Sequence, residues 1–300
     1  MLALAELLER DGAGAVLISA DSRQVFRGFD VGTDKLPAKV LEARPHAGID
    51  VAEADQPFTL YDWLEIAREA AAGTAGGETP KIAIAVGGTG LYHRGLLRGF
   101  LKGGARPHDP ELRKRLERDL AKEGREHIEA QLRGLNPAAA DAVANASPRR
   151  ILRALEIAQL GGDSMATEEE PWSGPSAYVL LDEPDLAAHR IKVAERAAAQ
   201  FAGGLVAEAK ALAARLPMGT PALSGIGYRE ALQYLAGDIS EEKAVAHSSG
   251  RSWAYARRQR TWYRSEPITH TIRAGALQSP EEVALGLYPI ARSLINQAGH

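Results

Sequence analysis

The sequence contains no cysteine, no long apolar run and no excess of positive charge, and each absence excludes a class of protein. Without cysteine, the chain has no disulfide framework, no thiolate zinc site and no cysteine nucleophile, which agrees with a reducing cytoplasm. No stretch approaches the roughly 18 apolar residues of a membrane span. Glu6, Glu9 and Arg10 interrupt the first apolar stretch, so we predict neither a signal peptide nor a membrane-bound protein.

The net charge of −3 excludes a protein-wide positive field, although a local basic face would still suffice to bind nucleic acid. None of the eight histidines has a metal-ligand spacing, and we assign no metal to His46. With 45% hydrophobic and 25% charged residues, the 300-residue chain predicts a globular protein with an ample core.

Apolar runs alternate with helical segments along the first third of the chain. We predict strands over 15–19 and 81–86 and helices over 2–10, 60–72 and from residue 91. Strand, turn and helix repeated in this order are typical of a parallel sheet with crossover helices. The sequence therefore predicts an α/β fold.

The pattern changes after residue 103. Residues 104–166 contain short charged helices and no strand signal, and Asp109-Pro110 marks a helix start. Further strands are predicted over 177–182 and 268–272. We therefore divide the chain into a first core segment (1–103), a helical insertion (104–166) and a second core segment with basic C-terminal helices (167–300).

The first strand ends in the polar sequence ISADSRQVFRGFDVGT, which begins at Ile18. Asp21 lies where α/β enzymes present catalytic groups, at the carboxyl edge of a parallel sheet. Ser22, Arg23 and Gln24 follow it, and Arg and Gln are suited to binding bases and phosphates. The alternative is that Asp21 only caps a turn.

A glycine turn, Gly87-Gly88-Thr89-Gly90, connects the strand at 81–86 to the next helix. Glycines allow a tight turn, and a helix N-terminus offers free N–H groups to an anion. The Thr89 hydroxyl adds a donor there. The alternative is a tight strand–helix connection without a ligand.

Three further segments contain arginine, and two of them also contain aromatic residues. Arg149 and Arg153 lie four residues apart on one predicted helix face, which is equally typical of a solvated face. GIGYRE at 225–230 is a loop–helix junction or a plain hinge. Residues 251–264 hold five arginines, four aromatics and no acid, a composition suited to phosphates and splayed bases. An interdomain packing helix is the alternative for this last segment.

Taken together, these segments resemble the bacterial tRNA dimethylallyltransferases, also called isopentenyl-diphosphate:tRNA transferases. The resemblance covers nearly the whole chain and runs in order through ISADSRQVFRGFDVGT, Pro45-His46 with Ile49-Asp50, VGGTGLY, RRILRALE, GIGYRE and YARRQRTWYR. It implies a fold similar to P-loop kinases, with a helical insertion that holds the anticodon stem-loop of tRNA. It also implies transfer of a dimethylallyl group from its diphosphate to the exocyclic N6 amine of the adenosine beside the anticodon.

The resemblance assigns roles to individual residues. Asp21 matches the catalytic base, Thr89 the hydroxyl beside the leaving group, and Arg229 a cation for the diphosphate. The residues implied in diphosphate binding are Gly87, Gly88, Thr89, Gly90 and Arg229. The residues implied in tRNA binding are Asp21, Ser22, Arg23, Gln24, Arg149, Arg150, Arg153, Arg257, Arg258, Gln259, Arg260, Thr261, Trp262 and Arg264. Mg²⁺ is implied as a cofactor held mainly by the diphosphate, and we expect a cytoplasmic monomer.

The phosphate loop GxxxxGK[ST] that this family carries before its first helix has no counterpart in these 300 residues. We therefore expect the first strand and this loop to be missing ahead of Met1. Two alternatives follow: a truncated tRNA-binding homologue with impaired catalysis, and a P-loop kinase-like adenylate prenyltransferase or small-molecule nucleotide kinase.

Overall fold

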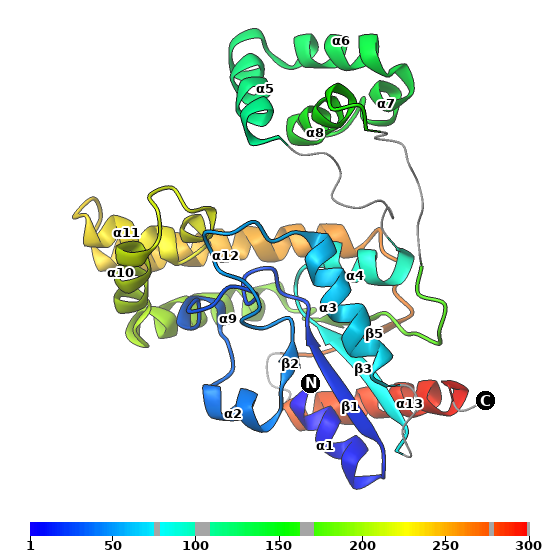
Figure 1. Ribbon diagram of the computed structural model, residues 1–300. Coiled ribbons are helices and arrows are strands. Elements are labelled where there is room, and N and C mark those ends of the chain that lie inside the picture. Colours follow the sequence, from blue (N-terminus) through cyan, green and yellow to red (C-terminus); the bar gives the residue numbers. More distant parts are fainter. Residues whose placement is uncertain (75–78, 100–108, 163–170, 276–278, 299–300) are drawn as a thin grey trace. The chain divides into compact units, whose positions relative to one another are not determined.

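The computed structural model describes residues 1–74, 79–99, 109–162, 171–275 and 279–298 (Figure 1). The chain divides into two compact units. Unit 1 comprises Met1–Leu97 and Trp172–His300, and unit 2 comprises Arg98–Pro171. The expected domain boundaries at 103/104 and 166/167 lie outside the described residues.

Unit 1 contains two small parallel sheets. In the first, β1 (Gly14–Ser19) lies between β2 (His46–Ala47) and β3 (Lys81–Val86). In the second, β4 (Val179–Asp182) pairs with β5 (His270–Arg273). The parallel α/β core is therefore confirmed. The two-residue strand β2 was not predicted, because two residues leave no periodicity to detect.

The second sheet is shorter than the sequence indicates, because the Thr269 hydroxyl takes the place of one backbone acceptor at its start. Thr269 N–H donates to the Tyr178 carbonyl at 2.9 Å, and the Thr269 hydroxyl accepts from Tyr178 N–H at 2.9 Å. Regular pairing then begins at Val179 and His270. The predicted strands at 177–182 and 268–272 are thus present but begin two residues later.

Helices pack around the first sheet. α3 (Leu60–Ala72) contacts β1 and β3, while α1 (Leu2–Arg10) packs against α13 (Pro280–Ala298). Ile82 and Ile84 of β3 contribute to the core that α1 and α13 form. Among the described strands, β3 pairs only with β1 and β4 only with β5, so each has one side with unpaired backbone groups.

A second helical layer of unit 1 surrounds Phe29, Leu205 and Tyr228. Its longest helix, α12, runs from Glu241 to Tyr263 and packs against both α9 and α11. The remaining elements of unit 1 are η1 (Val31–Thr33), α2 (Ala38–Ala43), α4 (Gly90–Arg98), α9 (Leu186–Ala202), α10 (Leu205–Arg215), η2 (Pro221–Ser224) and α11 (Tyr228–Leu235).

Unit 2 is helical throughout its described part, as the sequence predicts. It contains α5 (Pro110–Glu123), α6 (Arg125–Leu135), α7 (Pro137–Ala142) and α8 (Pro148–Gln159). The Asp109 side chain accepts from the N–H groups of Glu111 and Leu112, which confirms the predicted cap. The core of unit 2 includes Leu116, Ile128, Leu132, Ile151 and Leu155.

Candidate active site

The loops after β1 and β3 meet at the carboxyl edge of the first sheet. Thr89 N–H donates to the Ala20 carbonyl at 3.1 Å, and the Thr89 hydroxyl accepts from Ser22 N–H at 3.0 Å. A Cβ atom on Gly87 would lie 2.2 Å from the Ala20 carbonyl oxygen, so only glycine permits this approach. The structure thus brings the Asp21 segment and the glycine turn together, as their positions after parallel strands predict.

Asp21 is half-buried beside this contact. Its Oδ1 accepts a hydrogen bond from Arg23 N–H at 2.7 Å, and Oδ2 has no protein partner among the described residues. Burial, followed by the negative charge of Asp21, raises the pKa of Tyr92 to about 12 and also raises that of Tyr255. The carboxylate therefore has one fixed oxygen and one free oxygen, and two neutral tyrosines lie within range of its charge.

Gln24 uses its side-chain amide within the protein. Its Oε1 accepts from the Ser19 hydroxyl at 2.9 Å, and its Nε2 donates to the Thr33 carbonyl at 3.0 Å. In this arrangement Gln24 fixes the path of the loop between β1 and η1. Its expected contact with tRNA stays a prediction, as does that of the exposed Arg23.

The glycine turn is held by a helix that is distant in the sequence. The Gly88 carbonyl accepts from Gln259 Nε2 at 2.8 Å and from the Tyr255 hydroxyl at 3.3 Å, both on α12. The Gly87 carbonyl accepts from His93 Nε2 on α4 at 3.0 Å. Motif reasoning missed Tyr255 and His93, although the aromatic content of α12 and the position of His93 four residues after Thr89 were available signals.

Arg229 lies away from this cluster. It is the second residue of α11 and is exposed, and its side chain forms no ion pair or hydrogen bond among the described residues. Figure 1 shows α11 and α4 at opposite ends of α12. Asp21 and Thr89 therefore lie in adjoining loops, whereas Arg229 does not lie beside them. The diphosphate role of Arg229 stays a prediction.

The predicted tRNA-binding arginines fall into two groups. Arg153 pairs with buried Glu156 at 2.8 Å, and Arg260 pairs with Asp182 at 2.7 Å. The second group has exposed side chains without an ion pair in the described part of the chain: Arg23, Arg149, Arg150, Arg257, Arg258 and Arg264. Only this second group is free to meet phosphate.

Two charged side chains that the sequence analysis did not single out, the buried Lys35 and the half-buried Glu208, fix the loop after Asp21. The Lys35 side chain is 2% exposed, and its Nζ contacts Asp30 at 2.9 Å and Asp50 at 2.5 Å. The Glu208 carboxylate accepts from Val31 N–H at 2.8 Å. A single lysine or glutamate cannot be recognised from the sequence as a residue that fixes a loop, because its partners come from other elements.

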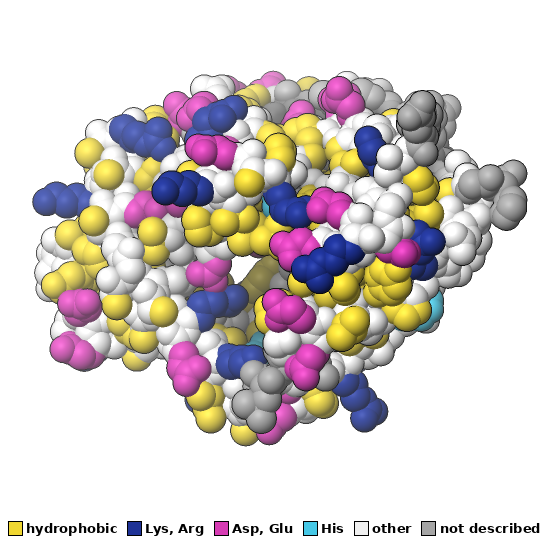
Figure 2. Space-filling model, turned by 90° about the horizontal axis from the view of Figure 1, so that it is seen from below, with side chains coloured by type: hydrophobic (Ala, Val, Ile, Leu, Met, Phe, Trp, Pro, Cys, Tyr) yellow, Lys and Arg dark blue, Asp and Glu magenta, His cyan; other side chains and the backbone are white. Residues whose placement is uncertain are grey.

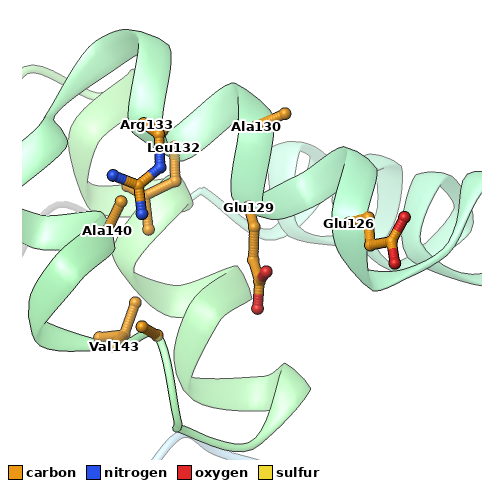
Figure 3. Close-up of a pocket in the computed structure, with 8 residues that line it drawn as sticks. Glu126, Glu129, Ala130, Leu132, Arg133, Ala140 and Val143 are labelled. Carbon is orange, nitrogen blue, oxygen red and sulfur yellow. The ribbon is translucent and has the colours of Figure 1, made fainter.

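Unit 2 has a shallow pocket of about 260 Å³ between α6 and α7 (Figure 3). Glu126 and Glu129 line it together with Arg133, whose guanidinium pairs with Asp141 at 2.9 Å. Because two carboxylates line the pocket and its arginine is paired, it is unsuited to phosphate. On the face in Figure 2, acidic and basic side chains are likewise mixed.

The described residues offer neither a ready-made metal site nor a membrane-spanning helix. They contain no cluster of three or more His, Asp or Glu side chains arranged for a metal ion. None of their helices combines the length and the apolarity that a bilayer crossing requires.

Comparisons with known proteins agree with the geometry. Residues 24–266 match the protein family described as IPP transferase. The tRNA dimethylallyltransferase of Anaeromyxobacter dehalogenans is 38% identical over 259 residues, which cover 84% of each chain. That of Clavibacter sepedonicus is 36% identical over 87% of this chain and 84% of its own.

The fold comparison gives the same result. The full-length tRNA isopentenylpyrophosphate transferase of Bacillus halodurans superposes with a TM-score of 0.61 at 25% identity, covering 99% of this chain and 91% of its own. The family match spans both core segments and the helical unit between them. The chain therefore belongs to the IPP transferase family.

Proposed function

We propose that this protein transfers a dimethylallyl group from dimethylallyl diphosphate to the exocyclic N6 amine of the adenosine beside the anticodon of tRNA. Family membership supports the reaction class. The observation that carries the proposal is the contact between Ser22 N–H and the Thr89 hydroxyl, which brings the carboxylate of Asp21 beside the glycine turn. A proton acceptor and a leaving-group site are thereby adjacent.

Asp21 is the proton acceptor in this proposal. An adenine amine is a weak nucleophile because its lone pair is delocalised into the ring. As the N6–C1 bond forms and the C1–O bond to the diphosphate breaks, the amine proton passes to the free Oδ2 of Asp21. The bonding electrons leave with the diphosphate. A positioned base of this kind contributes about 10²–10⁴-fold to the rate.

The leaving diphosphate is bound at the glycine turn. Thr89 N–H is already engaged with Ala20, whereas the N–H groups of Gly87, Gly88, Gly90 and Leu91 have no acceptor among the described residues; the last two lie at the N-terminus of α4. The Thr89 hydroxyl accepts from Ser22 and retains its own hydrogen to donate to a phosphate oxygen. Donors directed at developing negative charge stabilise the transition state.

Mg²⁺ would complete the diphosphate site. The residues near the glycine turn offer few oxygen ligands beyond the Thr89 hydroxyl, because Asp21 Oδ2 accepts the amine proton. This small set fits an ion that takes most of its ligands from phosphate and water. When bound, the ion would neutralise charge on the diphosphate as it leaves.

The tRNA is bound through unpaired arginines of both units. Arg149 and Arg150 begin α8, while Arg257, Arg258 and Arg264 lie on or just after α12. Their exposed guanidinium groups suit phosphate contacts. The target adenosine must leave its stack to reach Asp21, which costs a few kcal/mol.

The test is prenyl transfer to an anticodon stem-loop from labelled dimethylallyl diphosphate. We expect Asp21→Asn to lower kcat by about 10²-fold or more while stem-loop affinity is retained. Asp55→Asn is the matched control, because Asp55 is exposed and has no partner among the described residues. Unchanged turnover in Asp21→Asn would remove Asp21 from the mechanism.

A second candidate function is binding of tRNA without transfer. It is favoured by the lack of any GxxxxGK[ST] sequence in the 300 residues, since such a loop supplies several phosphate donors at once. The same assay separates the candidates. Stem-loop binding without label incorporation would support the second candidate, and incorporation would exclude it.

A further inference from the structure

We infer that Gln259 is a positioning residue for the diphosphate-binding turn, and that α12 serves the two substrates with different faces. One face of the helix fixes the glycine turn, and exposed arginines elsewhere on it bind tRNA. This inference rests on the proposed function and deepens it. The family resemblance implies that Gln259 and Trp262 bind tRNA, whereas this inference assigns both residues to the diphosphate site.

Four residues on one stripe contact the glycine turn and α4. Tyr255, Gln259 and Trp262 are spaced four and three residues apart, so they share a face of α12, and Glu266 continues this stripe in the turn that follows the helix. The first two donate to the Gly88 carbonyl. The structure thus directs the polar groups of this stripe inward.

The other two members of the stripe hold the start of α4. The Trp262 ring covers Gly90, where a Cβ atom would lie 2.2 Å from Trp262 Nε1. The Arg94 guanidinium lies 4.0 Å from the Trp262 ring centroid, and Arg94 Nε donates to buried Glu266 at 2.9 Å. A cation stacked on tryptophan and paired with a buried carboxylate is well held in place.

The Gly88–Thr89 peptide is therefore clamped at both ends. Its carbonyl accepts from Gln259 and Tyr255, while its N–H donates to Ala20. Since Gly88 has no side chain to restrict it, these bonds set the orientation of the peptide plane. That orientation determines where the Thr89 hydroxyl and the N–H groups of Gly90 and Leu91 point. Removing the donor from Gln259 would loosen the diphosphate site without touching the arginines.

In contrast to the residues that contact the glycine turn, three arginines on or just after α12 face solvent: Arg257, Arg258 and Arg264. They are exposed, and none of them forms an ion pair within the described residues. Arg258 also lies over the Tyr255 ring, 5.7 Å from its centroid. These side chains remain available to an RNA backbone while the inward stripe is occupied.

The experiment compares Gln259→Met with Arg257→Ala in the full chain. Methionine keeps the length and volume of glutamine but donates no hydrogen bond. We expect Gln259→Met to raise the Kd for dimethylallyl diphosphate about tenfold, a change of about 1.4 kcal/mol, with stem-loop affinity unchanged. Arg257→Ala should show the reverse pattern. Loss of stem-loop affinity in Gln259→Met, with unchanged diphosphate binding, would overturn the inference.

Two further variants separate positioning from a general loss of structure. In Gln259→Glu the carboxylate cannot donate but the protonated acid can, so diphosphate affinity relative to wild type should recover as the pH falls from 7 through the ordinary glutamate pKa of about 4.3. Tyr255→Phe removes the weaker donor and should give a smaller change in the same direction. A Gln259→Glu deficit that is independent of pH would contradict a donor role.

A ligand-free measurement keeps this test separate from that of the proposed function. Amide hydrogen exchange over residues 87–92 should be faster in Gln259→Met than in wild type. If the wild-type chain binds the stem-loop but transfers no prenyl group, the transferase proposal fails while the exchange result still decides the inference. Equal exchange in the two proteins would overturn the inference alone.

Discussion

The Tyr228 hydroxyl donates to the Glu208 carboxylate at 2.6 Å, and the same carboxylate accepts from the N–H groups of Val31 and Gly32 at 2.8 and 3.2 Å. A Cβ atom on Gly32 would lie 2.4 Å from the Tyr228 ring. Burial, followed by the hydrogen bond to Glu208, raises the pKa of Tyr228. The tyrosine of GIGYRE thus fastens the loop that follows Asp21, which gives this motif a structural role.

We expect Tyr228→Phe to lower the free energy of unfolding by about 1–3 kcal/mol, because the half-buried Glu208 Oε1 loses the shorter of its two hydrogen bonds. Urea denaturation measures the change. Tyr234→Phe is the matched control, since the Tyr234 hydroxyl has no partner among the described residues and its removal should cost less than about 0.5 kcal/mol. Equal effects of the two substitutions would deny Tyr228 this role.

Gly87→Ala should abolish most transfer activity. The added Cβ would meet the backbone of Ala20, which cannot rotate away as a side chain can, so the two loops must separate. Gly134→Ala, in α6, has nothing within 4 Å and should instead stabilise the protein by about 0.5–1 kcal/mol. Turnover by the Gly87→Ala variant close to that of wild type would show that the contact at Ala20 is dispensable.

A buried histidine, His46, and a half-buried one, His93, predict a loss of stability in acid. Burial lowers the pKa of both His46 and His93 below the ordinary value. The unfolded chain then binds more protons than the folded one as the pH falls below about 6.5. Stability contributed by the neutral imidazoles is complete above that pH and is lost progressively below it.

Substitutions that cannot titrate test this pH dependence. His93→Gln can still donate to the Gly87 carbonyl, and His46→Asn to the Arg44 carbonyl. We expect a smaller drop in unfolding free energy between pH 7.5 and 5 for each variant than for wild type. His247→Gln, at an exposed position, serves as the control. If the unfolding free energy of both variants falls with pH as it does in wild type, His46 and His93 do not cause the loss of stability in acid.

Neighbouring arginines of α8 should respond differently to alanine. Arg149 is exposed and unpaired in the described residues, so Arg149→Ala should weaken stem-loop binding and reduce its salt dependence with little change in stability. Arg153 pairs with Glu156, which is 1% exposed, so Arg153→Ala leaves a buried charge short of a partner. That substitution should cost about 3 kcal/mol or less, because Arg113 also pairs with Glu156 at 3.5 Å.

Thermal melting and binding titrations at two salt concentrations distinguish these outcomes. A large stability loss in Arg149→Ala, or an unchanged salt slope, would mean that Arg149 does not contact phosphate. If Arg153→Ala keeps the stability of wild type, the ion pair with Arg113 is by itself sufficient to stabilise the buried Glu156 carboxylate.

Local patterns in the sequence were sufficient for much of the fold. The apolar run over 81–86 and the Asp109-Pro110 cap predicted β3 and the start of α5, because strand burial and helix capping depend on adjacent residues. The two-residue strand β2 and the delayed start of β4 escaped prediction. Both depend on pairing partners that lie far away in the chain.

The candidate site shows the same division. The sequence alone determined that a carboxylate and a glycine turn each follow a strand, and parallel pairing then requires them to share one edge. Only the tertiary structure decided which arginines are free: Arg149 and Arg153 share one helix face, yet buried Glu156 pairs with one of them. It also turned Gln259 inward to Gly88 and placed α11, the helix that carries Arg229, at the end of α12 opposite α4. Side-chain partners are set by packing between distant elements, which local sequence does not encode.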